Sequence, residues 1–194
     1  IDSWIRKFTN QWVNSSFTEH TISDSLVDGV YFWRARTKDN YNVASNYSYK
    51  KSFKIDVTRP VGNITIHEGI SSVNDKLVDL AIHAFDNASG VADMQIIGDR
   101  GNEGPWEEFA TEKRFALTPL DGLKKIIIRF RDNAGIVSED YNDTIYFDLK
   151  GPFDIEVTSP THPDPMVYYN STLPVFSWEP PYEVTGIKGY TYTV

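Results

Sequence analysis

The stretch DGLKKIIIRFRDNAGIVS, residues 121–138, repeats a pattern that stands earlier in the chain as DGVYFWRARTKDNYNVAS, residues 28–45. The Asp-Gly, the Arg at 36 and 129, the Asp-Asn and the final Ser coincide without a gap. Each copy is followed by an apolar residue, an Asp and a Pro, in IDVTRP and FDLKGP, displaced by one residue. A self-match at a fixed spacing is typical of tandem domains. We therefore expect a modular chain with junctions near Pro60 and Pro152.

Apolar residues alternate with polar ones in the segments that we expect to be strands. In the middle of the chain, the residues predicted to face a core are Val78, Leu80, Ile82 and Ala84, then Ile126, Ile128 and Phe130. In the earlier copy, the predicted buried face holds Tyr31, Trp33, Ala35 and Thr37, with Phe32, Arg34 and Arg36 opposite. No segment shows the 3.6-residue apolar period of a helix over ten or more residues, so helix content should be negligible.

The two ends of the chain read as complementary halves of one domain. Residues 151–194 contain three predicted strands, in FDIEVTSP, PVFSWEPP and GIKGYTYTV, and residues 1–58 contain the pattern of a last hairpin. Together the ends have 44 plus 58, or 102 residues, and a seven-stranded sandwich takes roughly 100. We predict an all-β chain of tandem β-sandwich domains, with incomplete sandwiches at both ends.

The predicted domains are a C-terminal half-sandwich at 1–58, a complete sandwich at 59–150 and an N-terminal half-sandwich at 151–194. A neighbouring unit would complete each half. Trp33 and Trp178 are expected in the cores, since such sandwiches place one Trp between their sheets.

Composition excludes several classes of protein. The chain has no Cys, so it has neither disulfides nor thiol chemistry. Its net charge is −8 and no run of Lys or Arg exceeds two, which disfavours nucleic-acid binding because a phosphate backbone needs a clustered basic face. No stretch of about 20 apolar residues is present, so we expect no direct membrane insertion in this segment.

Asn-x-Ser/Thr sequons are the strongest indication of a compartment. Six of the 12 Asn begin one, and with 30 Ser and Thr in 194 positions chance would give roughly two. One interpretation is that Asn, Ser and Thr are common in β-turns; the other is a secreted, N-glycosylated protein. Glycosylation is predicted at Asn14, Asn46, Asn63, Asn87, Asn142 and Asn170. An extracellular chain without Cys points to an archaeal or bacterial source.

A family resemblance is carried by two groups of segments. SWEPPYEVTGIKGYTYTV together with LVDGVYFWRARTKDNYNVASNYSYKKSFKIDVTRP resembles the fibronectin type III-like repeats of large archaeal and bacterial cell-surface proteins. FDNASGVADMQIIGD, PWEEF and LDGLKKIIIRFRDNAGIVSEDYNDTIYFD resemble the immunoglobulin-like repeats that alternate with them. The resemblance implies tandem immunoglobulin-like and fibronectin type III-like β-sandwich domains, with an immunoglobulin-like sandwich at 59–150 between fibronectin type III-like halves at 1–58 and 151–194. It also implies an extracellular structural, S-layer-like, filament-forming or adhesive role, and it implies no particular activity.

Catalytic motifs are lacking in the sequence. The four His, at 20, 67, 83 and 162, stand alone, and no HExxH motif, nucleophile elbow or phosphate-binding glycine loop occurs. Glu107 and Glu108 are adjacent in a predicted strand, so they would point to opposite faces and could not flank one glycosidic bond. We expect that the protein is not an enzyme and needs no organic cofactor.

Calcium is the one cofactor that the sequence suggests. Asp39, Asp86 and Asp132 each precede an Asn at the start of a predicted turn, and Ca²⁺ prefers carboxylate, amide and carbonyl oxygens. Asp56 or Asp148, near the predicted junctions, could complete a cage. The alternative is that these Asp side chains only cap the backbone of their own turns.

A carbohydrate platform is a second binding hypothesis. Trp12 and Trp106 are the residues proposed to stack on sugar rings, with Trp4, Tyr168 and Tyr169 as further candidates. Aromatic residues beside loops are also often packed lids. In this interpretation, the chain would be a carbohydrate-binding or adhesive accessory module of a large secreted protein.

Assembly follows from the two predicted half-domains. A half-sandwich has open strand edges and an uncovered apolar face, so it is unstable alone. The C-terminal half of one subunit could pair with the N-terminal half of the next, as in strand complementation, giving a head-to-tail homopolymer. Alternatively, one longer polypeptide could contain the same units as covalent tandem repeats. Both organisations predict a cell-surface filament, sheath or lattice.

Overall fold

The computed structural model describes residue 21 and residues 24–193 of the chain. The chain divides into two units, Ile1–Val57 and Thr58–Val194, and each is described by itself. The named elements are β1 Gly29–Trp33, β2 Lys51–Ile55, β3 Val61–Ile66, a 3₁₀ turn at His67–Gly69, β4 Ser72–Val73, β5 Leu77–Phe85, β6 Val91–Ile97, β7 Glu103–Glu108, β8 Glu112–Ala116, β9 Gly122–Asp132 and β10 Tyr141–Phe147.

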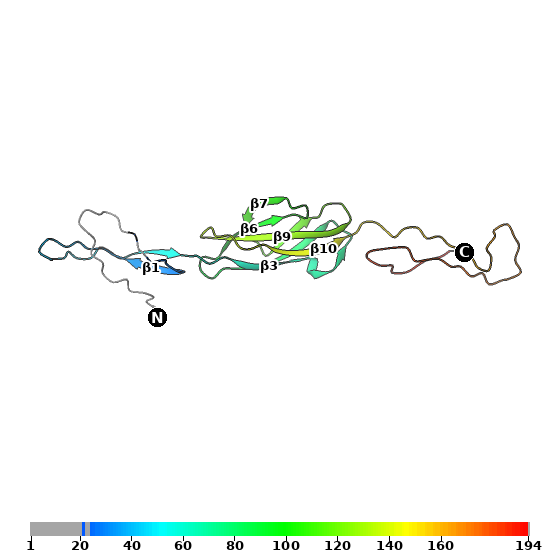
Figure 1. Cartoon of the computed structure of the whole chain (residues 1–194), viewed down its shortest axis with the longest axis horizontal. Coiled ribbons are helices and arrows are strands. Elements are labelled where there is room, and N and C mark those ends of the chain that lie inside the picture. Colours follow the sequence, from blue (N-terminus) through cyan, green and yellow to red (C-terminus); the bar gives the residue numbers. More distant parts are fainter. Residues whose placement is uncertain (1–20, 22–23, 194) are drawn as a thin grey trace. The chain divides into compact units, whose positions relative to one another are not determined.

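Strands β3 to β10 form a β-sandwich within the second unit (Figure 1). One sheet has five strands in the order β4-β10-β9-β6-β7, and the other has three in the order β3-β5-β8. Neighbouring strands are antiparallel except β4 and β10, which pair parallel. The prediction of an all-β, immunoglobulin-like β-sandwich is thus confirmed. A membrane-spanning helix is not found in the part of the chain that the structure describes.

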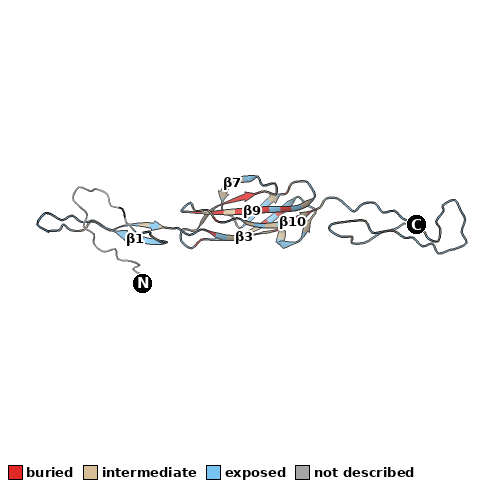
Figure 2. Ribbon diagram, viewed as in Figure 1, coloured by how far each residue is buried: buried red, intermediate tan, exposed pale blue. Residues whose placement is uncertain are grey.

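The core lies between the two sheets (Figure 2). β5 has apolar residues at every second position, and the inward ones are completely buried while Asp79 and His83 are exposed. β9 shows the same alternation of burial over 11 residues, with Lys124 and Asp132 at inward positions beside the apolar ones. The predicted inward sets are confirmed, with Ala84 only partly buried: Val78, Leu80, Ile82, Ile126, Ile128 and Phe130 are all core residues. Each such side chain contributes about 1.5–3 kcal/mol through removal from water.

The first unit differs from its predicted pattern. Among its described residues, only β1 and β2 form a sheet, with Tyr31 stacked on Phe53 across the pair. Trp33 is 51% exposed, and Ala35 and Thr37 are exposed as well, so the predicted buried face is wrong except for the half-buried Tyr31. The alternation is present, but a two-stranded sheet has no second sheet to cover either face.

Residues 151–193 also differ from the sequence prediction. They contain a single antiparallel bridge, between Thr158 and Ser177, in place of three strands. Trp178 is half-buried against Tyr190, with ring centroids 5.3 Å apart, and does not occupy a core between sheets. A strand requires a hydrogen-bonded neighbour along its length, and this segment supplies one only at Thr158. The predicted boundary at 150 and the half-sandwich at 151–194 stay predictions.

A buried polar cluster joins the two sheets near the start of β9. Lys124 points inward, where the alternation of β9 places a core residue, and is 6% exposed. Its Nζ donates to Thr118 Oγ1 at 2.7 Å and lies 3.3 Å from Asp99 Oδ2. Thr118 donates to the same Asp99 oxygen from its N–H and its hydroxyl. The buried ammonium is therefore neutralised by a carboxylate of its own chain.

Gly62 lies in β3 opposite Ala84, where the backbone approaches the core closely. A methyl group at this position would overlap the carbonyl oxygen of His83 and the ring of Phe130. We expect Gly62→Ala to lower the free energy of unfolding by about 1–3 kcal/mol, because neither neighbour can move away freely. Urea unfolding followed by tryptophan fluorescence would measure it. Gly151→Ala, which meets no atom within 4 Å, should change stability by less than about 0.5 kcal/mol; equal effects would contradict the prediction.

The Asp99 cluster predicts a pH dependence. Burial alone would raise the pKa of Asp99, but the hydrogen bonds from Thr118 and Lys124 outweigh it and lower that pKa below 3.8. Asp99→Asn should therefore cost about 3–5 kcal/mol near neutral pH, since it leaves the Lys124 ammonium buried without a carboxylate. The stability that Asp99 contributes is complete above its unfolded-state pKa and is lost as the pH falls through the lower folded-state value.

The difference in stability between wild type and Asp99→Asn should accordingly narrow as the pH falls through the lowered folded-state pKa of Asp99. Urea denaturation at neutral and acidic pH measures this difference. Asp79→Asn is the control, because Asp79 pairs with Arg114 while 67% exposed, and should cost at most about 1 kcal/mol. A difference for Asp99→Asn that does not change with pH would show that its carboxylate is not the source of the stabilisation.

Candidate functional site

Asp132 ends β9 and organises the turn that follows. Its Oδ1 accepts hydrogen bonds from the N–H groups of Ala134 and Ile136, at 2.8 and 2.9 Å. Gly135 takes a positive φ of 89° in this turn, which Gly adopts without steric cost. The side chain thus replaces backbone acceptors, as Asp does in Asx turns.

Asp86 does the same at the end of β5, in the other sheet. Its Oδ1 accepts from the N–H groups of Ala88, Ser89 and Gly90 at 2.9–3.1 Å. The two turns are in contact, because Asn133 Nδ2 donates to the carbonyl oxygens of Ser89 and Gly90 at 2.9 and 3.1 Å. The ends of β5 and β9 are therefore held side by side.

The second carboxylate oxygens of Asp86 and Asp132 define the candidate site. Asp132 is 2% exposed and Asp86 is 9% exposed. Each Oδ2 is inaccessible to solvent and has no hydrogen-bond partner among the described residues. One carboxylate oxygen of Asp86 lies within 4.8 Å of one of Asp132. The structure thus brings together two of the three residues predicted as metal ligands.

Asp39, the third predicted ligand, stands in the first unit and has different surroundings. Its Oδ1 accepts from the N–H groups of Tyr41 and Val43, both at 2.9 Å, and Asn42 has a positive φ of 68° where the other turn has Gly135. The turn chemistry is the same as at Asp132, but Asp39 is exposed. Its hydrogen bonds are fully explained by capping of the turn.

Asp148 and Asp56, which the sequence suggested could complete a calcium cage, are not assigned to the site of Asp86 and Asp132. Asp148 Oδ1 accepts from Lys150 N, and its Oδ2 accepts from Thr185 Oγ1 at 2.9 Å. Asp56 belongs to the first unit, and its predicted part in a cage stays a prediction.

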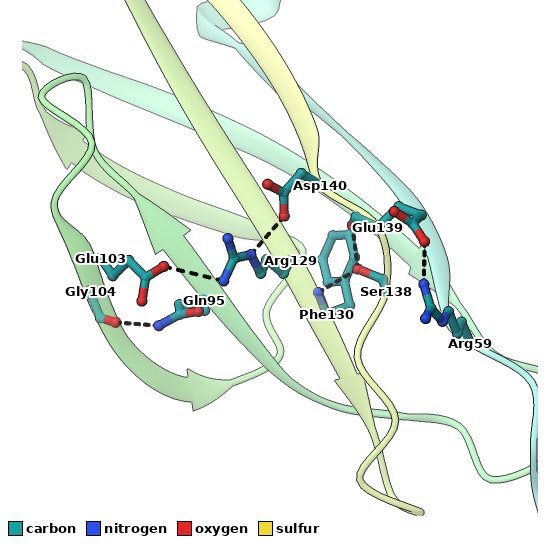
Figure 3. A network of polar contacts seen from close by, with 9 residues as sticks. All are labelled: Arg59, Gln95, Glu103, Gly104, Arg129, Phe130, Ser138, Glu139 and Asp140. Carbon is teal, nitrogen blue, oxygen red and sulfur yellow. Dashed lines mark hydrogen bonds and ion pairs between the residues drawn. The ribbon is translucent and has the colours of Figure 1, made fainter.

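Sequence reasoning missed a serine clamp at the end of each repeated hairpin pattern. Ser138 Oγ accepts from Phe130 N at 2.9 Å and donates to Glu139 O at 2.7 Å (Figure 3). Ser45 bonds Thr37 N and Asn46 O in the same way, at 3.1 and 3.0 Å. The sequence contained a signal for this clamp, because Ser45 and Ser138 are the last residues of the two matching segments, 28–45 and 121–138.

The predicted glycosylation sites are all exposed where they are described. Asn14 lies outside the described residues. The exposed ones are Asn46, Asn63, Asn87, Asn142 and Asn170. In one sequon the hydroxyl also has a structural role, since Ser48 Oγ accepts from Ala35 N at 3.0 Å. Exposure permits glycan attachment at these sites, and attachment itself stays a prediction.

The predicted carbohydrate platform has one described Trp, at 106, since Trp12 and Trp4 lie outside the described residues. Trp106, in β7, is half-buried, and the guanidinium of Arg131 lies 4.7 Å from its ring centroid. Arg131 in turn pairs with Asp93 of β6. One face of the Trp106 ring is therefore already occupied by a cation of the chain.

The same strands carry an ion-pair network on the five-stranded sheet (Figure 3). Arg129 Nε donates to Asp140 Oδ1 at 2.6 Å, and its Nη1 lies 3.3 Å from Glu103 Oε1. The hydrogen bond to Asp140 raises the pKa of Arg129 above its usual value. Gln95 Nε2 donates to Gly104 O at 2.9 Å beside them. The side chains of Arg129 and Gln95 thus find their polar partners within the protein.

The other aromatic candidates lie in the segment 151–193. Tyr168 is fully exposed, while Tyr169 packs edge-on against His162 with centroids 4.9 Å apart. A sugar platform needs several ring faces on one exposed surface. Of the described residues predicted for the platform, only Tyr168 has a fully exposed ring, and the carbohydrate hypothesis stays a prediction.

No protein-family model and no curated protein matches the chain. Among solved structures, it is similar to the PKD1 domain of Vibrio anguillarum Epp, with 12% identity and a TM-score of 0.37 over 48% of this chain and 98% of that chain. It is also similar to the PKD1 domain of the Vibrio cholerae metalloprotease PrtV, with 15% identity and a TM-score of 0.37 over 47% and 99%. The fibronectin(III)-like modules of Clostridium thermocellum CbhA show 13% identity and a TM-score of 0.40 over 62% and 63%.

Proposed function

We propose that the chain is an extracellular structural part of a cell-surface protein, in which β-sandwich units joined head to tail form a filament, sheath or lattice. The observation that supports this is the distribution of apolar burial. Among the residues that the structure describes, the buried hydrophobic core extends from Ile64 to Phe147, while the described segments on either side expose large apolar side chains. Such surfaces are typical of protein interaction sites.

The hairpin of β1 and β2 shows this exposure clearly. Val30, Phe32 and Trp33 lie in one strand and are 53%, 52% and 51% exposed. Because neighbouring residues of a strand face opposite sides, both faces of this hairpin carry uncovered apolar area. A two-stranded hairpin is marginally stable at best in water, so contact with further strands would stabilise it.

Residues 151–193 show the same property. Phe153, Val175 and Phe176 are 77%, 50% and 53% exposed. These residues stand in the segments that the sequence predicts as strands of a sandwich. Pairing with strands of another unit would satisfy their backbone and cover their apolar side chains.

A neighbouring unit of the same kind is the partner that we propose for both segments. The sequence patterns of 1–58 and 151–194 are those of complementary halves, so one surface would fit the other. A contact between two different surfaces of identical units propagates into a fibre unless its rotation closes a ring. The neighbour is either a second copy of the chain or a further stretch of one longer polypeptide. We assign the chain no catalytic step and no nucleic-acid partner.

Exposed sequons support an extracellular location. Five described sequon Asn are accessible, and the number of sequons is about three times the chance value. A glycan is bulky and solubilising, and it requires a solvent-facing position.

The assembly is expected to depend on the flanking apolar side chains. Full-length chain should sediment as oligomers whose size grows with concentration, since each contact buries apolar area that the monomer exposes. Phe32→Ser and Phe176→Ser should each shift the distribution toward monomer, by about tenfold or more in dissociation constant. Sedimentation velocity over a wide concentration range would measure this.

Leu123→Ser is the matched control, because Leu123 is 67% exposed on the complete sandwich and should leave assembly unchanged. The intact deglycosylated mass of native material distinguishes a subunit near 22.1 kDa from one longer polypeptide. Both Ser variants assembling like wild type, or a strictly monomeric 22.1 kDa native chain, would overturn the proposal.

Glycans are expected on native material at the exposed sequon residues. Peptide mass spectrometry after enzymatic deglycosylation should find modified peptides containing Asn63 and Asn142, which lie in β3 and β10 and are exposed. Asn74 and Asn102 are also exposed but begin no sequon, so they should be unmodified. Unmodified peptides at every sequon would remove the support for glycosylation and would leave the assembly to be judged on sedimentation alone.

A further inference from the structure

We propose that the carboxylates of Asp86 and Asp132 bind a calcium ion at the end of the sandwich where β5 and β9 end. Both residues belong to the second unit, so the site is part of one described body. Its existence does not depend on the assembly proposed above.

The first step of the argument concerns unsatisfied charge. Asp132 is only 2% exposed. Its Oδ2 is inaccessible to solvent and has no hydrogen-bond partner among the described residues. Asp86 Oδ2 has the same properties. Burying a carboxylate oxygen without a partner is costly, and burying two carboxylates close together adds their mutual repulsion. A bound cation removes both costs.

The second step is a comparison with the other end of β9. There the buried carboxylate of Asp99 lies 3.3 Å from the ammonium of Lys124, so the chain supplies its own cation. At Asp86 and Asp132, no Lys, Arg or His forms an ion pair with either carboxylate within the described ranges. The neutralising charge at this end has to come from outside the described residues.

The third step concerns the kind of cation. Calcium binds oxygens at about 2.3–2.6 Å, so one ion can contact two oxygens up to about 4.6–5.2 Å apart. One carboxylate oxygen of Asp86 lies within 4.8 Å of one of Asp132, a separation that such an ion can bridge. Magnesium needs distances of about 2.0–2.1 Å and a near-ideal octahedron, whereas calcium accepts irregular sets of oxygen ligands. Oxygen ligands and flexible coordination therefore favour calcium.

The turns prepare the two oxygens for this role. Because Oδ1 of each Asp is held by backbone N–H groups, each Oδ2 is fixed in place before an ion arrives. Ser89 Oγ, in the turn of Asp86, is also buried without a hydrogen-bond partner among the described residues. Backbone carbonyls and water would supply the remaining ligands that calcium requires.

The test uses the full chain, freed of metal with a chelator. About 10 mM CaCl₂ should raise the thermal unfolding midpoint by several degrees, because the ion binds only the folded site. Calcium titration followed by amide chemical shifts should move the signals of residues 86–90 and 132–136 first. A dissociation constant of about 10⁻⁴–10⁻³ M is expected, as for extracellular calcium modules.

Asp132→Asn and Asp86→Asn are the matching variants. Asn keeps Oδ1 for the turn and replaces the charged Oδ2, so the variants should fold without metal, with midpoints equal to or above that of metal-free wild type. Both should lose the calcium response. Asp39→Asn, which changes the same kind of turn at an exposed position, should retain the full response.

Other outcomes would overturn the proposal. A wild-type chain whose midpoint ignores calcium but rises as the pH falls toward about 5 would show that the two carboxylates share a proton instead. A calcium response that survives both variants would place the ion elsewhere. If a variant fails to fold, the calcium titration of wild type still tests the proposal. Amide chemical shifts that calcium leaves unchanged in both turns would exclude a calcium ion there.

Discussion

The fold depends on one constraint, that the apolar face of a β-sheet must be covered by another layer. β5 and β9 meet it in full, because each places alternate residues against the opposite sheet and these residues have essentially no contact with water. The hairpin of β1 and β2 carries apolar side chains as well, yet Trp33 is half exposed. The hairpin has the same kind of alternating sequence as β5 and β9, and it differs from them in having no second sheet to cover it among the described residues.

The same constraint explains which parts of the fold could be predicted from sequence. Alternation gives the direction of each side chain relative to its neighbours, so the inward residues of β5 and of β9 could be predicted. Alternation also placed Lys124 among the inward positions, although a charged residue there was not recognised as part of the core. Whether a face is covered is a non-local property, and for this reason alternation alone could not predict that Trp33 is half exposed or that residues 151–193 form a single bridge within the chain.

The candidate site shows the same division between local and non-local information. Asp39 and Asp132 begin nearly identical turns, with the same N–H donors at the second and fourth following residues. The sequence could therefore predict the turns but not a difference between them. That difference comes from burial, since Asp132 ends a central strand of a packed sheet and stands beside Asp86, 46 residues earlier in the sequence.

Two ends of one strand thus show two solutions to the same electrostatic problem. Near the start of β9, Lys124 reaches Asp99 and Thr118 and connects the five-stranded sheet to the loop that follows β8 of the other sheet. At its end, Asp132 meets Asp86, which follows β5 of the other sheet, and the described residues give the pair no cation. An ion bound there would join the two sheets as Lys124 does at the opposite end. Since β5 and β9 belong to different sheets, its loss would loosen the packing between layers and not the hydrogen bonding within either of them.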